Sequence, residues 1–277
     1  MSYFTTNGHK LHFWERGEGP LMLILPGSTA ASVHYSGELN YFCHNFHVAA
    51  LDFWGTGDSE RLEVWPDTWW EKAAKDAAAL IDHLGSEKAV VMGSSGGGIV
   101  ALLAAAMFPE KVSAVIADST VEHWPDLPDI VAKRTLNIAE IIRQEGSLRK
   151  AWPRLKVIPQ MTAFYRIGHG LDAKKIVQAD SDFLLRVAEK NIQPLKGRLE
   201  QITCPVLLIA SKVDRELHDV EGQLASMSER IKNVQVNLAE EGSHPYMWSQ
   251  PKAFREAANS FLSQLDGITI TQRDLEE

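Results

Sequence analysis

Cysteine is scarce in this 277-residue chain, which contains only Cys43 and Cys204. Two cysteines are too few for a disulfide framework, and we expect both to be free thiols in a reducing compartment. No apolar run approaches the roughly 18 residues needed to cross a bilayer. The first residues also lack the basic and apolar segments of a signal peptide. We therefore expect a soluble cytoplasmic protein with no membrane partner.

Basic residues are also in deficit, with 28 Lys and Arg against 36 Asp and Glu, a net charge of −8. This balance argues against a nucleic-acid partner. Hydrophobic residues make up 45% of the chain and charged ones 23%, enough apolar material for a sizeable core. The sequence leaves the oligomeric state open.

Short apolar runs bounded by turn residues predict strands buried in a parallel sheet. An Asn7-Gly8 turn predicts a hairpin before them, and Thr68 with Glu71 predicts a capping box at the start of a helix. Helical patterns alternate with the strands, so the sequence predicts an α/β fold, a mainly parallel sheet flanked by helices. The expected strands are 21–26, 47–53, 89–93, 112–118, 205–211 and 234–240, and the expected helices 68–85, 97–108 and 251–265.

The interval 120–200 lacks any buried-strand pattern and predicts several short helices. We expect it to be a helical cap inserted after the sixth strand, with 1–119 and 201–277 forming the core domain. Its aromatic residues could line an acyl pocket or pack the cap onto the sheet. The cap contains 14 Lys and Arg against 10 Asp and Glu, a charge of +4 that leaves −12 on the remainder. The proposed pocket residues are Trp124, Trp152, Phe164 and Tyr165, with Phe183 as a further aromatic.

Two serines followed by three glycines, at 94–98, lie between an expected strand and an expected helix. A flexible linker does not fit between two core elements, and a phosphate-binding loop would need a lysine after its last glycine. The pattern G-x-S-x-G does fit, from Gly93 to Gly97. In that nucleophile elbow the central serine is exposed by a strained turn. The spacing therefore selects Ser95 and not Ser94.

A serine nucleophile needs a base, and the base needs a carboxylate to orient it. His244 follows the last expected strand and Asp214 the one before it, at the ends where α/β sheets form sites. Their order after Ser95 is the order used in this architecture. Asp118, at the end of another strand, is the rival acid.

The oxyanion formed during acyl transfer needs backbone N–H donors. Gly96, the residue after the nucleophile, should supply one. The other should come from the small turn-forming loop "PGSTAAS" at 26–32, with Ser28 as first choice and Thr29 as second. We expect neither a metal nor an organic cofactor.

These motifs together resemble the α/β-hydrolase superfamily, and "DFWGTGDS" at 52–59 is similar to its D-x-x-G-x-G-x-S turn, with Trp54 where Arg is frequent. Within it the chain resembles the valacyclovir hydrolases, or biphenyl-hydrolase-like proteins, in "NGHKLHFWERGEG", "LPG", "KDAAALIDHLG" and "GGIVALLAAAMFPEKV". That branch has a substrate-binding carboxylate directly after the nucleophile. Here the position is Gly96, so amino-acid-ester specificity does not carry over.

The sequence thus predicts a serine hydrolase that cleaves small to medium carboxylic esters through an acyl-enzyme. Amino-acid ester hydrolases, lactonases, carbon–carbon-bond hydrolases and perhydrolases use the same triad and remain alternatives. A non-catalytic ligand-binding relative is the alternative of another class. The related dehalogenases and epoxide hydrolases use an aspartate nucleophile, which Ser95 argues against.

Overall fold

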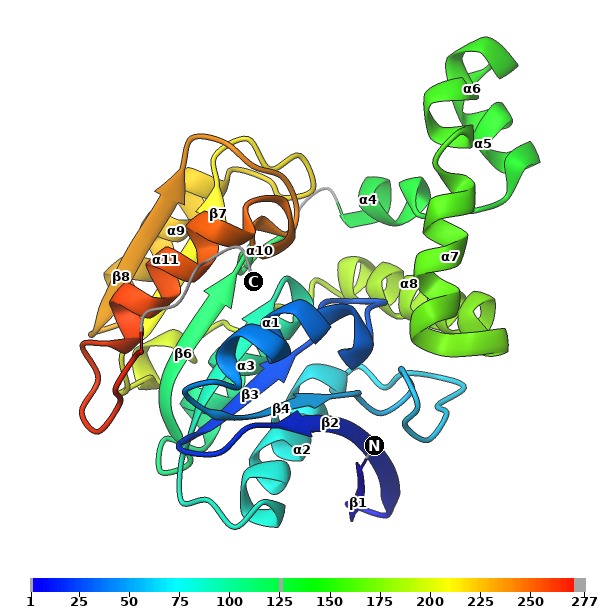
Figure 1. Ribbon diagram of the computed structural model, residues 1–277. Helices are drawn as coiled ribbons and strands as arrows, with labels where there is room; N and C mark the ends of the chain where they lie inside the picture. The colour runs from blue at the N-terminus through cyan, green and yellow to red at the C-terminus, as the bar shows by residue number, and fades with distance from the viewer. Residues whose placement is uncertain (1, 125–126, 272–277) are drawn as a thin grey trace.

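The computed structural model describes residues 2–124 and 127–271. Within them the chain forms an eight-stranded sheet of order β1-β2-β4-β3-β5-β6-β7-β8 (Figure 1). The pairs β1–β2 and β2–β4 are antiparallel, and all other neighbours are parallel. The strands are β1 (Ser2–Thr6), β2 (His9–Arg16), β3 (Leu21–Leu25), β4 (His47–Leu51), β5 (Ala89–Ser94), β6 (Val112–Asp118), β7 (Val206–Ser211) and β8 (Val234–Ala239).

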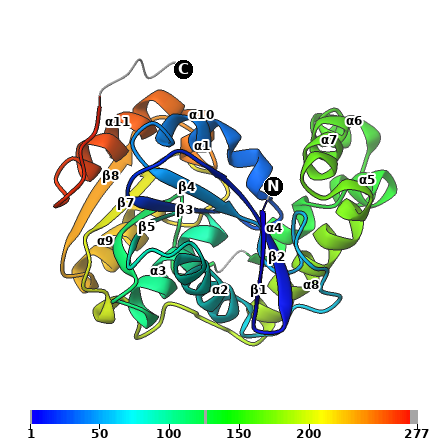
Figure 2. The same ribbon diagram turned by 60° about the horizontal axis from the view of Figure 1, so that its bottom comes forward.

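Helices cover both faces of the sheet, with α1, α10 and α11 on one side and α2 and α3 on the other (Figure 2). Both faces need covering because alternate side chains of a strand point to opposite faces, and in β3 all of these side chains are apolar. Leu21, Leu23 and Leu25 pack in the cluster that includes α2 and α3, whereas Met22 and Ile24 pack in the cluster that includes α1 and α11. The flanking helices are α1 (Ser36–Phe42), α2 (Trp69–His83), α3 (Gly96–Met107), α9 (Val220–Arg230), α10 (Tyr246–Ser249) and α11 (Pro251–Leu262), and a 3₁₀ turn, η1 (Ser32–Tyr35), precedes α1.

Between β6 and β7 lies a helical insertion, which we define as α4 to α8, and which stands to one side of the sheet (Figures 1 and 2). α7 runs from α5 and α6 towards α8, and the insertion contacts the sheet domain through α7, which packs on η1, and through Phe183 of α8. Its helices are α4 (Leu127–Lys133), α5 (Ile138–Glu145), α6 (Leu148–Leu155), α7 (Ile158–His169) and α8 (Ala173–Glu189).

The fold matches the predicted class, and the hairpin at Asn7-Gly8 is present, with both turn residues at positive φ. Two expectations are wrong. Thr68 makes no side-chain cap to α2, so the capping box is absent there. The strand expected at 234–240 forms as β8 but is largely exposed, because it lies at the edge of the sheet.

Among the residues that the structure describes, no helix is both long and apolar enough to span a membrane.

Candidate active site

The parallel strands bring the predicted site residues to one edge of the sheet. Ser28 lies three residues beyond β3, Ser95 directly follows β5, and Asp118 ends β6. Asp214 and His244 lie in the loops that follow β7 and β8. Because the carboxyl ends of parallel strands share an edge, residues spread over more than 200 positions meet there.

Ser95 sits in a sharp turn between β5 and α3 with φ of 52° and ψ of −120°. A positive φ is strained for a residue with a side chain, and such strain is typical of functional turns. The turn is possible because its flanking residues are glycines. A Cβ on Gly93 would lie 2.1 Å from the Gly97 carbonyl oxygen, and one on Gly97 would lie 2.2 Å from that of Leu25.

The neighbouring Ser94 has a different environment. Its side chain is 1% exposed, and its Oγ donates a hydrogen bond to Asp118 Oδ2 at 3.1 Å. The same hydroxyl lies near the hydroxyl of Tyr35, which accepts from the Gly27 N–H at 2.9 Å. Ser94 therefore belongs to a buried polar network and borders only the larger cavity, whereas Ser95 lines both cavities.

His244 is oriented by Asp214, whose Oδ2 lies 2.9 Å from His244 Nδ1. The Asp214 carboxylate is itself fixed, because its Oδ1 accepts from the Glu216 N–H at 2.9 Å. Burial on its own would lower the pKa of His244, but the hydrogen bond and charge of Asp214 outweigh it and leave the pKa above its usual value. An imidazole that donates from Nδ1 to a carboxylate presents a basic Nε2 on its other side.

The rival acid, Asp118, is not bonded to His244. Its carboxyl accepts hydrogen bonds from Ser94 and from the backbone N–H of Met247, the latter at 3.3 Å. Complete burial raises the pKa of Asp118 to about 7, although the nearby His244 and these hydrogen bonds act in the opposite direction. A carboxyl that is partly protonated at neutral pH is a poor partner for an imidazolium.

Ser28 and Gly96 face each other across the start of α3. A Cβ built on Gly96 would lie 2.6 Å from Ser28 Oγ and 3.4 Å from Ser28 N. The backbone amides of these two residues are therefore near neighbours beside Ser95. There is also no room at Gly96 for a side chain unless the Ser28 hydroxyl moves.

Two cavities open beside Ser95, and Ser28 and His244 line both. The smaller, about 30 Å³, is largely apolar, while the larger, about 270 Å³, extends beneath α7. The apolar side chains of the smaller cavity are Trp70, Ile99, Trp124, Leu127, Leu184 and Leu217.

The structure separates the four aromatic residues proposed for the pocket. Trp124 lines the smaller cavity, and Phe164 and Tyr165 line the larger one. Trp152 is the exception, since it lies on α6 with 62% of its surface exposed and lines neither cavity. α6 is distant from the sheet edge, which the sequence pattern did not indicate. Phe183 is buried against the tryptophans of the core.

Two charged residues that the sequence analysis did not single out also line both cavities, Arg134 and Glu216. Arg134 donates to Asp180 Oδ2 at 2.9 Å, and complete burial raises the pKa of Asp180 to about 6. Glu216 is exposed, and its charge contributes to the raised pKa of His244. Its position two residues after Asp214 was the available signal, whereas nothing in the sequence marks Arg134.

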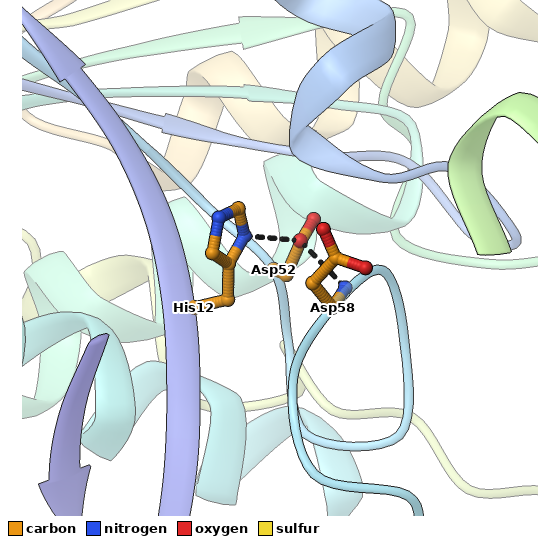
Figure 3. Close-up of side chains that lie close together, drawn as sticks. All are labelled: His12, Asp52 and Asp58. Carbon is orange, nitrogen blue, oxygen red and sulfur yellow. Dashed lines mark hydrogen bonds and ion pairs between the residues drawn. The ribbon is translucent and has the colours of Figure 1, made fainter. Parts of the chain in front are cut away.

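The turn at 52–59 forms, with His12 of β2, a separate polar cluster of His12, Asp52 and Asp58 (Figure 3). Ligand atoms of these three residues lie within 4.8 Å of one another, a spacing that a metal site could use. Both Asp52 oxygens already have partners: Oδ1 accepts from the Ser32 N–H at 2.6 Å, and Oδ2 from His12 Nδ1 at 2.7 Å and the Asp58 N–H at 2.9 Å. The cluster thus ties two loops together, and its hydrogen bonds favour that role over metal binding.

Comparison with known proteins agrees with this architecture. A family model described as the alpha/beta hydrolase fold matches residues 20–251. The putative carbamate hydrolase RutD of Caulobacter sp. (strain K31) is 25% identical over 263 residues, 92% of this chain and 95% of that protein. The human serine hydrolase BPHL is also 25% identical, over 92% of this chain and 84% of its own length.

Solved structures show the same fold. A hydrolase from Pseudomonas aeruginosa PA01 superposes with a TM-score of 0.72 at 21% sequence identity, over 94% of this chain and 97% of that one. The matched region contains the elbow, Asp214 and His244, and the human relative lies in the branch that the sequence resembles. The chain therefore belongs to the alpha/beta hydrolase fold family.

Proposed function

We propose that this protein is a serine hydrolase that cleaves carboxylic esters of small to medium size through an acyl-enzyme. The observation that supports this most directly is Ser95, held at positive φ beside cavities that His244 also lines. In the proposed mechanism His244 takes the proton of Ser95 as the hydroxyl attacks the ester carbonyl. Asp214 holds the imidazole in the required tautomer, and the amides of Ser28 and Gly96 stabilise the oxyanion.

The leaving alcohol then takes the proton from His244, and water attacks the acyl-enzyme with His244 again acting as base. We assign the acyl group to the smaller cavity because its lining is largely apolar. The larger cavity would hold the alcohol. In this assignment residues 120–200 act as a cap over the core formed by 1–119 and 201–277, with Trp124, Phe164 and Tyr165 against the substrate.

We further propose that neutral esters are preferred over α-amino esters. Gly96 offers no carboxylate for an ammonium group, and the interval 120–200 has a charge of +4. The carboxylate of Glu216 lines both cavities and opposes this preference at close range, whereas the spread charges of 120–200 are screened beyond about 8–10 Å at physiological salt. The preference therefore rests mainly on Gly96.

A substrate panel tests the proposal. The values of kcat/KM should be compared for a butyrate ester, its α-amino counterpart with the same leaving group, a lactone and a carbamate. Carbamates are included because of the relative named above. The butyrate ester should be the best substrate, and Ser95→Ala should lower its kcat by several powers of ten. A clear advantage for the amino ester would point to Glu216 as an ammonium-binding group, and near-normal turnover by Ser95→Ala would refute the mechanism.

A further inference from the structure

The turn that contains Ser28 is strained at a residue that is not glycine. The Ala30 N–H donates to the Gly27 carbonyl at 3.0 Å, which closes a four-residue turn. Its third residue, Thr29, has φ of 59°, whereas Ser28 is not at positive φ. This is the pattern of a type II turn, in which the third position is usually glycine. Something outside the turn must therefore stabilise it.

The stabilising contacts come from α7 of the helical insertion. His169 Nε2 lies 2.9 Å from the Thr29 carbonyl oxygen. The hydroxyl of Tyr165 lies near the hydroxyl of Thr29, which itself donates to the Ser28 carbonyl at 2.6 Å. A single helix, far along the chain, thus contacts both the backbone and the side chain of the strained residue.

The hydrogen bonds of His169 determine its tautomer. The Gly57 N–H donates to Nδ1 at 3.0 Å, so the proton of a neutral ring is on Nε2 and points at Thr29. The side chain is 2% exposed, and burial lowers the pKa of His169, which favours this neutral form. His169 is thus a fixed donor that bridges two loops of the sheet domain.

The rest of α7 docks closely on the same loop. A Cβ on Gly168 would lie 2.4 Å from His34 Cε1, so only glycine allows this approach. His34 Nε2 donates to the Phe164 carbonyl at 2.9 Å, and the two rings stack with centroids 3.8 Å apart. Its Nδ1 accepts from the Ala31 N–H at 3.0 Å. The contact between α7 and the loop is therefore continuous on both sides of Thr29.

We propose that His169 is a positioning residue that holds the Thr29 carbonyl and thereby keeps the turn in the shape that presents the backbone donors to the oxyanion. This inference rests on the proposed function. If Thr29 loses this contact, it can relax to negative φ only by rotating the peptide between Ser28 and Thr29, which reorients the Thr29 N–H and shifts Ser28. The oxyanion hole is then complete only when α7 is packed against the turn that contains Ser28 and Thr29.

Two amide variants separate the two hydrogen bonds of His169. The carboxamide of His169→Gln reaches the position of Nε2 and can still donate to Thr29. The shorter side chain of His169→Asn reaches only the position of Nδ1, where it can accept from Gly57 but not contact Thr29. Both variants replace the ring by the same polar group. A merely structural role would make them differ in stability without a parallel change in kcat and Ki. Arg166→Gln, on the exposed side of α7, is the control.

The readouts are kcat, KM and the Ki of a trifluoromethyl ketone, which forms a tetrahedral oxyanion adduct with a serine nucleophile. Loss of one oxyanion donor costs about 10²- to 10³-fold, so a misplaced turn should cost roughly 10- to 100-fold. We expect His169→Asn to lower kcat by that factor, to raise Ki in step and to leave KM within about twofold. His169→Gln and Arg166→Gln should stay within about threefold of the wild type in all three values.

The role of His169 would be overturned if kcat fell equally in the two His169 variants, or if only KM changed and Ki did not. The proposed function would still be supported by wild-type turnover. A wild-type protein that hydrolyses no ester would overturn both. If His169→Asn does not fold, Tyr165→Phe replaces it, since it removes the α7 hydroxyl that lies near Thr29. Tyr165 also lines the larger cavity, so only a parallel change of kcat and Ki at constant KM counts. This variant should lower kcat and raise Ki together by several-fold, and unchanged values would overturn the inference.

Discussion

Replacing Asp118 by asparagine should stabilise the protein at alkaline pH. Burial raises the pKa of this carboxyl from 3.8 to about 7 in the folded state. Between these values the folded protein holds a proton that the unfolded chain has released, so the free energy of unfolding falls as the pH rises. Each pKa unit is worth about 1.4 kcal/mol, and the full penalty above pH 7 is at most about 4 kcal/mol.

Asparagine has nearly the same shape and no charge. Its oxygen can accept from the Met247 N–H, as Asp118 Oδ1 does at 3.3 Å, and its amide can donate to Ser94, which lies 3.1 Å from Oδ2. Asp118→Asn should therefore match the wild type near pH 4 and be more stable at pH 8, by up to about 4 kcal/mol. At about 2–4 °C per kcal/mol for a chain of this size, the Tm should rise by up to roughly 8–16 °C.

Urea denaturation of both proteins near pH 4 and at pH 8 measures the effect. An Asp118→Asn protein that is less stable than the wild type at pH 8 would refute the reasoning, because it would show that the ionised carboxyl is satisfied in the fold. The variant should also keep turnover within a few-fold of the wild type. If Asp118→Asn abolished turnover while Asp214→Asn had only a mild effect, Asp118 would be the triad acid instead of Asp214.

Asp214→Asn should lower kcat by about 10⁴-fold, because the amide favours the wrong imidazole tautomer, and a loss below tenfold would contradict its role. The rate of ester hydrolysis should rise with pH through a midpoint above the usual histidine value of 6.5, since the base is neutral His244 and its pKa is raised. A rate profile with its midpoint clearly below 6.5 would contradict that assignment. Gly96→Asp should lower kcat for all esters and create no preference for amino esters, because its Cβ would lie 2.6 Å from Ser28 Oγ. A gain with amino esters would show that the site adapts.

The sheet and the elbow were predictable from the sequence because local patterns determine them. Glycines at 93 and 97 are required by backbone contacts of 2.1 Å and 2.2 Å, and the G-x-S-x-G spacing reports that requirement directly. The positions of Asp214 and His244 followed from the rule that parallel strands end at one edge. The geometry of Asp118, bonded to Ser94 and not to His244, required the structure because both acids follow buried strands.

The pocket was less predictable, since it depends on how distant helices pack. Trp152 and Trp124 look alike in the sequence, yet one is on the exposed α6 and the other lines a cavity. His169 had no sequence signal, because its role depends on contacts with Thr29 and Gly57, more than 100 positions away. The exposure of β8 was missed for the same reason, because the apolar residues of a strand do not indicate whether it lies at the edge of the sheet.

Covalent labelling tests the central claim most directly. The protein should be incubated with a fluorophosphonate, examined by intact mass and digested to locate the adduct. We expect one adduct, on Ser95, that is retained in Ser94→Ala and lost in Ser95→Ala. An adduct on Ser94, or no adduct in a protein that hydrolyses esters, would contradict it.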